Sequence, residues 1–296
     1  KAIEVYNPTN APINLKNYRL TRYSNGADLP PAETSWYVVL PNVELKPYKS
    51  YVLVIDKRNP LGKEQEAPVW EQLAERADAF LCPNYETSKA LYHNGDDAMA
   101  LEKLDGTLVD LFARWGPMAP VEAAIPGSTK KLACWTNTAP YFTGVGVGIT
   151  ADHTLVRKST VVNGVKLNPA LFNPLAEWDS LSANTFHQLG WHKYDGAPAN
   201  ATPVFTSNAF QFKVWKQSTA GKVIGTISAT DAENDALKYF INKGNFIYNN
   251  SDVRKVPFAL DAKTGVISVA DAGALLESTW DTLFLSISVT DGYSET

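Results

Sequence analysis

The side chains best suited to chemistry in this chain of 296 residues are its few histidines and one group of acids. The histidines are His93, His153, His187 and His192. His187 and His192 lie five residues apart around Gly190, which matches no metal-binding spacing, and no HxH, HExxH or DxH motif occurs. A Gly-x-Ser-x-Gly nucleophile elbow is also absent from the sequence. The sequence therefore predicts structural roles for the histidines and no enzymatic activity.

The carboxylate pair in Asn94-Gly95-Asp96-Asp97 resembles a pair of metal ligands. It directly precedes a stretch with strand pattern. Asn, Gly and Asp together favour a turn, because Asx side chains bond nearby backbone amides. We therefore interpret this segment as a turn that leads into a strand.

The acids of the C-terminal region are Asp231, Glu233, Asp235 and Asp291. Short strands with turn residues between them are expected near residues 209–215, 222–229, 237–241, 257–260, 265–268 and 283–290. In an up-and-down order, even-numbered strands share a direction, so the second and sixth strands end at one pole, near the junction with the preceding region. Clustered hard oxygen ligands suit Ca²⁺. Two interpretations stand: a weak calcium site, or a solvated acidic turn that caps strand ends.

Aromatic side chains offer a candidate surface for carbohydrate. Trp115, Trp135 and Tyr141 lie in or beside residues 116–150, which are rich in Pro, Gly and Thr and predict a long, ordered surface loop. Exposed rings there would stack on sugars, so glycan binding is one alternative function. Core packing is the expectation for Trp36, Trp178 and Trp215.

The only cysteines are Cys82 and Cys134. A disulfide between them is one interpretation for an exported protein, and two buried free thiols are the other.

Composition restricts the class of protein. The 27 basic and 31 acidic residues give a net charge of -4, and no window concentrates Lys or Arg as phosphate-backbone binding requires, so nucleic acid is not an expected partner. The sequence contains no run of about 18 apolar residues, which is the length needed to cross a bilayer. An apolar content of 45% and a charged content of 20% are ordinary for globular chains, and the length favours two domains.

Local patterns place the elements. Alternation over residues 2–15 predicts strand, turn and strand, and the apolar run 51–56 predicts a buried strand. Residues 67–81 have helical spacing, with Glu71, Glu75 and Arg76 on the outer face. Asp105-Gly106 predicts the two-residue turn of a hairpin over residues 101–112.

Residues 2–15, followed in order by 92–101, 105–110, 151–158, 173–178 and 185–190, resemble the lamin tail domain of secreted bacterial proteins. The resemblance covers about residues 1–192, with longer segments at 57–90 and 113–149. It implies an immunoglobulin-like β-sandwich. It also implies neighbouring catalytic domains, because bacterial lamin tail domains are often joined to secreted nucleases and phosphoesterases.

Residues 202–205, 229–239, 258–267 and 287–292 resemble bacterial cadherin-like domains. That resemblance implies interdomain calcium at the positions of Asp231, Glu233 and Asp291. The sequence departs from the family at 200–202, where extra carboxylates are expected, and at Leu276 and Ser278, which replace an acidic pair. A seventh strand is expected after residue 292, so the second domain is predicted to lack its last strand.

We therefore expect an all-β protein of two tandem immunoglobulin-like sandwiches, the first with an inserted helix and a long loop. The predicted domains are 1–192 and 204–296, joined by a linker at 193–203 rich in Pro, Ala and Asn. The expected role is a non-enzymatic interaction or spacer module, secreted or at the cell surface, that binds a protein or cell-surface partner. Accessory domains of a secreted hydrolase, or a glycan-binding module, are the alternatives.

Overall fold

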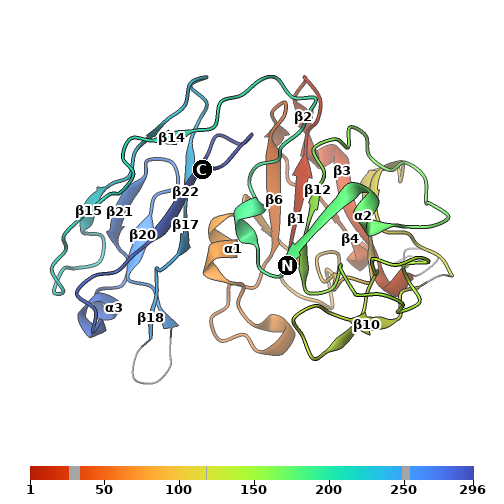
Figure 1. Cartoon of the computed structure of the whole chain (residues 1–296), viewed down its shortest axis with the longest axis horizontal. Coiled ribbons are helices and arrows are strands. Elements are labelled where there is room, and N and C mark those ends of the chain that lie inside the picture. The colour runs from red at the N-terminus through yellow and green to blue at the C-terminus, as the bar shows by residue number, and fades with distance from the viewer. Residues whose placement is uncertain (27–33, 118, 249–253) are drawn as a thin grey trace. The chain divides into compact units, whose positions relative to one another are not determined.

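A computed structural model describes residues 1–26, 34–117, 119–248 and 254–296. The chain divides into two compact units, Lys1–Ala197 and Pro198–Thr296 (Figure 1). Strands dominate both units and the helices are short, which confirms the all-β class. No helix in the described ranges is long and apolar enough to cross a membrane.

The first sheet of the N-terminal unit has the order β1-β6-β7. Its strands are β1 (Ala2–Tyr6), β6 (Ser50–Ile55) and β7 (Ala79–Leu81). β6 is the buried strand that its apolar run predicted, with Val52, Leu53 and Val54 fully inaccessible. Its odd-numbered residues Leu53 and Ile55 belong to one hydrophobic cluster and the even-numbered Val52 and Val54 to another, so both faces of the sheet are covered.

The second sheet has the order β4-β3-β8-β9. Its strands are β3 (Tyr18–Tyr23), β4 (Tyr37–Val39), β8 (Ala98–Lys103) and β9 (Leu108–Phe112). The hairpin predicted around Asp105-Gly106 is confirmed, but its loop has three residues, 104–106, because Lys103 N bonds Thr107 O. Only Gly106 has a positive φ, 89°, as in a type I turn followed by a bulge.

Smaller strand pairs complete the unit. They are β2 (Ile13–Asn14) with β5 (Glu44–Leu45), β10 (Glu122–Ala124) with β11 (Lys131–Ala133), and β12 (His153–Arg157) with β13 (Trp178–Ser182). The helices are α1 (Glu71–Glu75) and α2 (Pro174–Glu177). The Asn173 side chain caps α2 by accepting from Leu175 N at 3.1 Å.

The helix predicted over residues 67–81 is wrong for most of its length. Only residues 71–75 are helical, and residues 79–81 form β7, which pairs parallel with β6. Arg76 is buried at 1% exposure rather than on an outer face, because its guanidinium donates to Leu189 O at 2.6 Å and to His187 O at 3.3 Å. A tertiary partner therefore overrides the helical spacing.

The surface loop predicted at residues 116–150 is also corrected. The described part of that segment contains the β10–β11 hairpin and places Trp135 at 0% exposure in a core cluster with Phe172 and Ala113. Pro and Gly mark the turns of this segment, but its apolar residues fill the interior.

The C-terminal unit forms separate small sheets around one hydrophobic cluster (Figure 1). Its strands are β14 (Val204–Phe205), β15 (Val223–Thr226), β16 (Ala229–Thr230), β17 (Lys238–Lys243), β18 (Ile247–Tyr248), β19 (Arg254–Lys255), β20 (Phe258–Leu260), β21 (Val266–Val269) and β22 (Ser286–Thr290). β15, β21 and β20 form one sheet, and β17 pairs with β22. α3 (Ala272–Glu277) follows β21 and is capped by Asp271, which accepts from Ala274 N at 3.0 Å.

Two expectations for this unit are wrong. Residues 209–215 form no strand, and Trp215, expected in a core, is 82% exposed. Phe210 and Val214 are the members of this segment that pack on the core cluster. The apolar residues of 209–215 therefore contact the core from an irregular segment.

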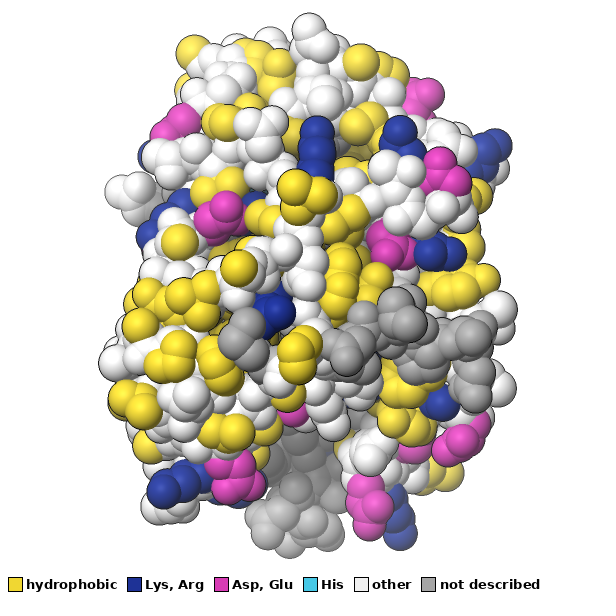
Figure 2. All heavy atoms as spheres, turned by 90° about the vertical axis from the view of Figure 1, so that its right-hand side faces the viewer, with side chains coloured by type: hydrophobic (Ala, Val, Ile, Leu, Met, Phe, Trp, Pro, Cys, Tyr) yellow, Lys and Arg dark blue, Asp and Glu magenta, His cyan; other side chains and the backbone are white. Residues whose placement is uncertain are grey.

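Charged side chains of both signs are interspersed with hydrophobic ones on the face over α2 and β10 (Figure 2). Neither sign gathers into a continuous patch on that face.

Candidate functional site

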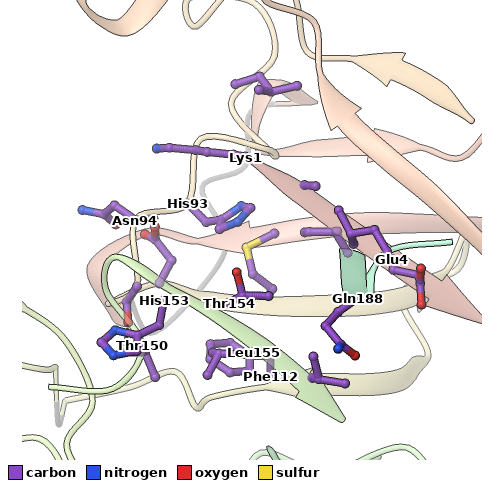
Figure 3. A pocket seen from close by; sticks show the side chains of 18 of the residues that line it. Lys1, Glu4, His93, Asn94, Phe112, Thr150, His153, Thr154, Leu155 and Gln188 are labelled. Atoms are coloured by element: carbon purple, nitrogen blue, oxygen red, sulfur yellow. Dashed lines mark hydrogen bonds between the residues drawn. The ribbon is translucent and has the colours of Figure 1, made fainter. Parts of the chain in front are cut away.

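A large cavity in the described part of the N-terminal unit, called the main cavity below, lies beside β1 and β12 and has a volume of about 1530 Å³. Its wall includes every residue of β1 and of β12, parts of β8 and β9, and part of the segment from Ala183 to Tyr194. Figure 3 shows Lys1 and Glu4 on one side and His153, Thr154 and Leu155 on another. Sequences far apart in the chain therefore meet around one space.

Glu4 is the most perturbed acid of this wall. Its carboxylate accepts a hydrogen bond from Gly190 N at 2.6 Å, which favours the charged form. Burial outweighs that bond and raises the pKa of Glu4 to about 8. The side chain is nevertheless partly exposed, because it borders the cavity. Glu4 is therefore a neutral carboxylic acid at neutral pH.

One end of the cavity is formed by His93, Asp97 and Arg22. Asp97 accepts from Asn25 N and Asn94 N, both at 3.0 Å, and pairs with Arg22 Nε at 3.0 Å. The predicted turn thus bonds backbone amides through Asp97. Burial raises the pKa of the neighbouring Asp96 to about 6.

Burial also holds the pKa of His93 well below its usual range. Its Nδ1 is buried with no hydrogen-bond partner among the described residues. His93 is therefore a neutral wall residue.

The other two histidines of the wall, His153 and His192, make contacts that stabilise the fold. His153 Nδ1 lies 2.7 Å from Ala151 O, and the His192 ring packs edge-on against Tyr6 at 4.9 Å. Burial, with a smaller contribution from the Arg157 charge, lowers the pKa of His192 to about 4. Neither ring is paired with a nucleophile or a carboxylate in the described contacts. His187, outside this wall, serves through its backbone carbonyl, which accepts from Arg76 and from Trp191 Nε1 at 3.0 Å.

The cations of the wall are mostly neutralised locally. Arg157 donates to Asp110 Oδ2 at 2.7 Å and to Glu177 Oε2 at 2.6 Å. Lys57 pairs with Glu66. In the described part of the chain, no three His, Cys, Asp or Glu side chains are placed to hold a metal ion. The cavity therefore offers backbone edges, apolar side chains and paired charges.

Two of the four predicted calcium ligands, Asp291 and Glu233, contact residues 200 and 201. Asn200 Nδ2 donates to Asp291 Oδ2 at 2.7 Å, and Ala201 N donates to Glu233 Oε2 at 3.2 Å. Asp231 Oδ1 accepts from Asp235 N at 2.8 Å. Asp291 also accepts from Tyr293 N and Ser294 N, at 2.7 and 2.8 Å. These bonds stabilise turns, and the contacts of Asp291 and Glu233 bring both carboxylates to the start of the unit.

The predicted glycan residues do not form one exposed surface. Trp135 is inaccessible, so its ring cannot stack on a sugar. Trp115 is half-buried and stacks on Tyr23 with ring centroids 4.4 Å apart. Tyr141 is half-buried and packs against the same core cluster as Trp135. Trp135 is therefore removed from the predicted site.

The structure agrees with the second interpretation of the cysteines, two buried free thiols. Cys82 and Cys134 are free and buried. Cys82 packs in the cluster of Leu91 and Ile55, whereas Cys134 packs in a different cluster with Ile125 and Ala151. The two thiols therefore serve as small apolar side chains.

Sequence reasoning missed the cavity and its acid. Glu4 is at a polar position of a strand in which apolar and polar residues alternate. Side chains at such positions ordinarily face the solvent. Its burial depends on residues 186–190, which are remote in sequence. A charged residue in a strand that is covered on both faces indicates a buried acid. That coverage can be recognised only when the segments packed on both faces of the strand are known.

Comparison with known proteins identifies the start of the chain. Residues 1–116 match the lamin tail domain. The match extends from β1 through β9 and confirms the resemblance over those residues. The matched residues contain both main sheets of the N-terminal unit. β12, β13 and α2 lie beyond the lamin tail match. No curated protein matches the chain.

Solved structures that match include cadherin extracellular domains. Human protocadherin-24 EC1-2 is 26% identical, with 33% of this chain and 40% of that chain covered and a TM-score of 0.26. The protocadherin γB4 extracellular domain is 13% identical, with 93% and 43% covered and a TM-score of 0.24. This chain spans less than half the length of either structure. The cadherin-like assignment of the C-terminal unit therefore rests on its sequence.

Proposed function

We propose that this chain is a non-enzymatic interaction and spacer module, secreted or at the cell surface, that positions neighbouring domains and binds a protein partner. The observation that carries the proposal is the lamin tail match over residues 1–116, on an all-β chain of two compact units. The cadherin-like sequence of the second unit agrees with a role in tandem extracellular architecture.

The buried polar groups of the lamin tail domain support this proposal, because they serve the fold. Glu102 on β8 is 4% exposed and accepts from Arg19 Nε at 2.8 Å, Thr21 Oγ1 at 2.7 Å and Tyr23 OH at 3.1 Å. All three donors lie on β3, so this network fastens β3 to β8. A carboxylate that is saturated by donors of the adjacent strand is not available as a base or nucleophile.

The test of the non-enzymatic role uses the whole chain with chromogenic phosphodiester, phosphomonoester, ester and glycoside substrates. We expect no turnover above that of a heat-denatured sample. Glu4→Gln and His93→Ala are the diagnostic variants, because these two residues have the most perturbed ionisation in the cavity wall. Turnover by the unaltered chain that falls in either variant would establish an enzyme and overturn the proposal.

We also propose weak calcium binding by Asp231, Glu233, Asp235 and Asp291 at the start of the C-terminal unit. The ion would have to draw these acids together, because no three such side chains of the described residues are already placed to hold a metal ion. The observation in its favour is Asp231 Oδ2, which is buried with no hydrogen-bond partner among the described residues. A cation would satisfy this oxygen, which is a hard ligand of the kind that Ca²⁺ accepts. The present hydrogen bonds of Glu233 and Asp291 would compete, so the affinity is expected to be millimolar.

Calorimetry and thermal melting in calcium test this site. Glu233→Gln should abolish the binding heat, because Glu233 is exposed and has few structural bonds to lose. Asp281→Asn is the control, since the Asp281 side chain is fully exposed and lies outside the cluster. Absence of heat and of a thermal shift at millimolar calcium would rule the site out.

A further inference from the structure

Two strand edges face the main cavity of the N-terminal unit. Among the described strands, β1 pairs with β6 alone and β12 pairs with β13 alone. All residues of both strands line the cavity, which happens when the edge of a strand, rather than one face, borders the space. The question is which backbone groups point into it.

The hydrogen-bond pattern of β1 answers this for the first edge. Ile55 N donates to Lys1 O, and Asn7 N donates to Lys49 O. In an antiparallel pair, residues that exchange hydrogen bonds alternate with residues that do not. Odd-numbered residues of β1 therefore bond β6, and the N–H and C=O groups of Ala2 and Glu4 point to the open edge.

The hydrogen bonds of β12 alternate in the same way. Lys158 N donates to Glu177 O, and the register continues with Val156 opposite Asp179. Even-numbered residues therefore bond β13. The backbone groups of His153, Leu155 and Arg157 point to the other edge, where none of them has a backbone partner in the described hydrogen bonds.

The cavity between these edges has the properties of a missing strand. Each edge is five residues long. The volume of about 1530 Å³ exceeds the range of about 300–1,000 Å³ that is usual for small-ligand pockets. Apolar side chains, including Met99 and Phe112, and uncharged polar ones, including Gln188, both line the cavity.

Charge complementarity points to an uncharged occupant. Arg157 is neutralised by Asp110 and Glu177, and Arg22 by Asp97, so both arginines of the wall are already paired. Lys1 Nζ donates to the Tyr92 carbonyl at 3.0 Å. A phosphate or a charged side chain placed between the strands would find no free opposite charge among these groups. Backbone amides and apolar or hydroxyl side chains match the wall.

We propose that the slot between β1 and β12 binds an extended peptide segment of a partner protein, which adds a strand to both edges at once. The inserted strand would join the β1-β6-β7 sheet to the β12–β13 pair, giving one sheet opposite β4-β3-β8-β9. The occupant is an alternating segment of five or more residues. Its apolar side chains face Met99 and Phe112, and its hydroxyl or amide side chains face Gln188. The proposal deepens the proposed function by naming the class of partner.

The test selects random linear nine-residue peptides, displayed on phage, against the immobilised full chain. Enriched peptides should alternate apolar and uncharged polar residues. Synthetic copies should raise the melting temperature of the N-terminal unit, because a ligand that binds only the folded state stabilises it. A proline at the centre of the best peptide should remove binding, because proline cannot donate to the strand ladder.

Substitutions at Leu155 locate the binding edge. Leu155→Pro removes a cavity-facing N–H but no bond to β13, and it should weaken the selected peptide roughly tenfold or more. Leu155→Ala keeps that N–H and should bind more tightly than Leu155→Pro. His153→Pro, at the first residue of β12, removes another cavity-facing donor where proline is better tolerated, and it serves if Leu155→Pro fails to fold.

The outcomes separate this inference from the proposed function. Failure to enrich any peptide, or equal binding by both proline variants and the unaltered chain, would overturn the slot. The non-enzymatic role would survive that result, because it depends on the substrate assays. A dimer in sedimentation that His153→Pro dissociates would show instead that a second copy supplies the strand, and would overturn the assignment to a partner protein.

Discussion

The buried acid Glu4 makes the stability of the N-terminal unit depend on pH in a predictable direction. Its pKa is raised from 4.5 to about 8 in the folded chain. The folded state therefore keeps a proton that the unfolded state loses as pH rises above about 4.5. The contribution of Glu4 is fully present below that pH and is lost as pH rises through about 8. At about 1.4 kcal/mol for each pKa unit, the loss has a ceiling of about 5 kcal/mol. We expect about 2 kcal/mol, because Glu4 borders the cavity and is partly exposed, which lowers the cost of its charge.

Denaturant unfolding of the full chain and of Glu4→Gln, from pH 4 to pH 9, measures this loss. The variant keeps a neutral side chain at every pH, so it should match the unaltered chain at pH 4 and exceed it by about 2 kcal/mol at pH 9. Taking the difference removes other titrations, including that of Asp96, whose pKa is about 6. Glu44→Gln, on the exposed side of β5, should give no difference at any pH. A flat difference curve for Glu4→Gln would refute the reasoning, since Glu4 would then be ionised in both states.

Three further predictions concern stability and thiol reactivity. Glu102→Ala should lower the free energy of unfolding by about 3–5 kcal/mol in chemical denaturation, because it leaves buried donors unpaired. The control Glu122→Ala, at an exposed position, should change the free energy of unfolding by less than about 0.5 kcal/mol. Equal effects of the two substitutions would contradict the structural role of Glu102. Cys82 and Cys134 should resist thiol reagents in the folded chain, because burial raises the pKa of both thiols, that of Cys134 to about 11. After denaturation without reductant, both thiols should react. If neither thiol reacts after denaturation, the two cysteines form a disulfide. Gly265→Ala should destabilise the C-terminal unit by more than about 1 kcal/mol in thermal melting. The reason is that Gly265 has φ +69° and an added Cβ would lie 2.1 Å from Ile227 O. An unchanged melting temperature would contradict this backbone geometry.

Local sequence patterns predicted those elements whose pairing and burial follow from their own residues. Alternation located β1, and the continuous apolar run located β6, which is buried on both faces. Asp105-Gly106 located the hairpin between β8 and β9, although the loop is one residue longer than expected. In each case the local propensity and the tertiary environment agree.

The errors arose where a remote partner decides the structure. Residues 79–81 have helical spacing, but pairing with β6 makes them a strand. Arg76 is charged, yet the carbonyls of His187 and Leu189 satisfy it in the interior. Trp135 lies in a segment rich in Pro and Gly, and its burial against Phe172 has no local signal.

The candidate slot could not be predicted for a related reason. A pattern of side chains shows which face of a strand is buried, but it does not show which edge lacks a partner. The open edges of β1 and β12 follow from the register of two separate pairs. That register depends on residues more than forty positions away from β1, at Lys49 to Ile55.

Residue-resolved amide hydrogen exchange on the free chain tests the open edges most directly. The account predicts alternation: the amides of Ala2, Glu4 and Leu155 exchange quickly, whereas those of Ile3 and Val156 are protected by their bonds to β6 and β13. Addition of a selected peptide should slow the fast set and leave the protected set unchanged. Strong protection of Ala2, Glu4 and Leu155 in the free chain would contradict the account, because those edges would already be paired.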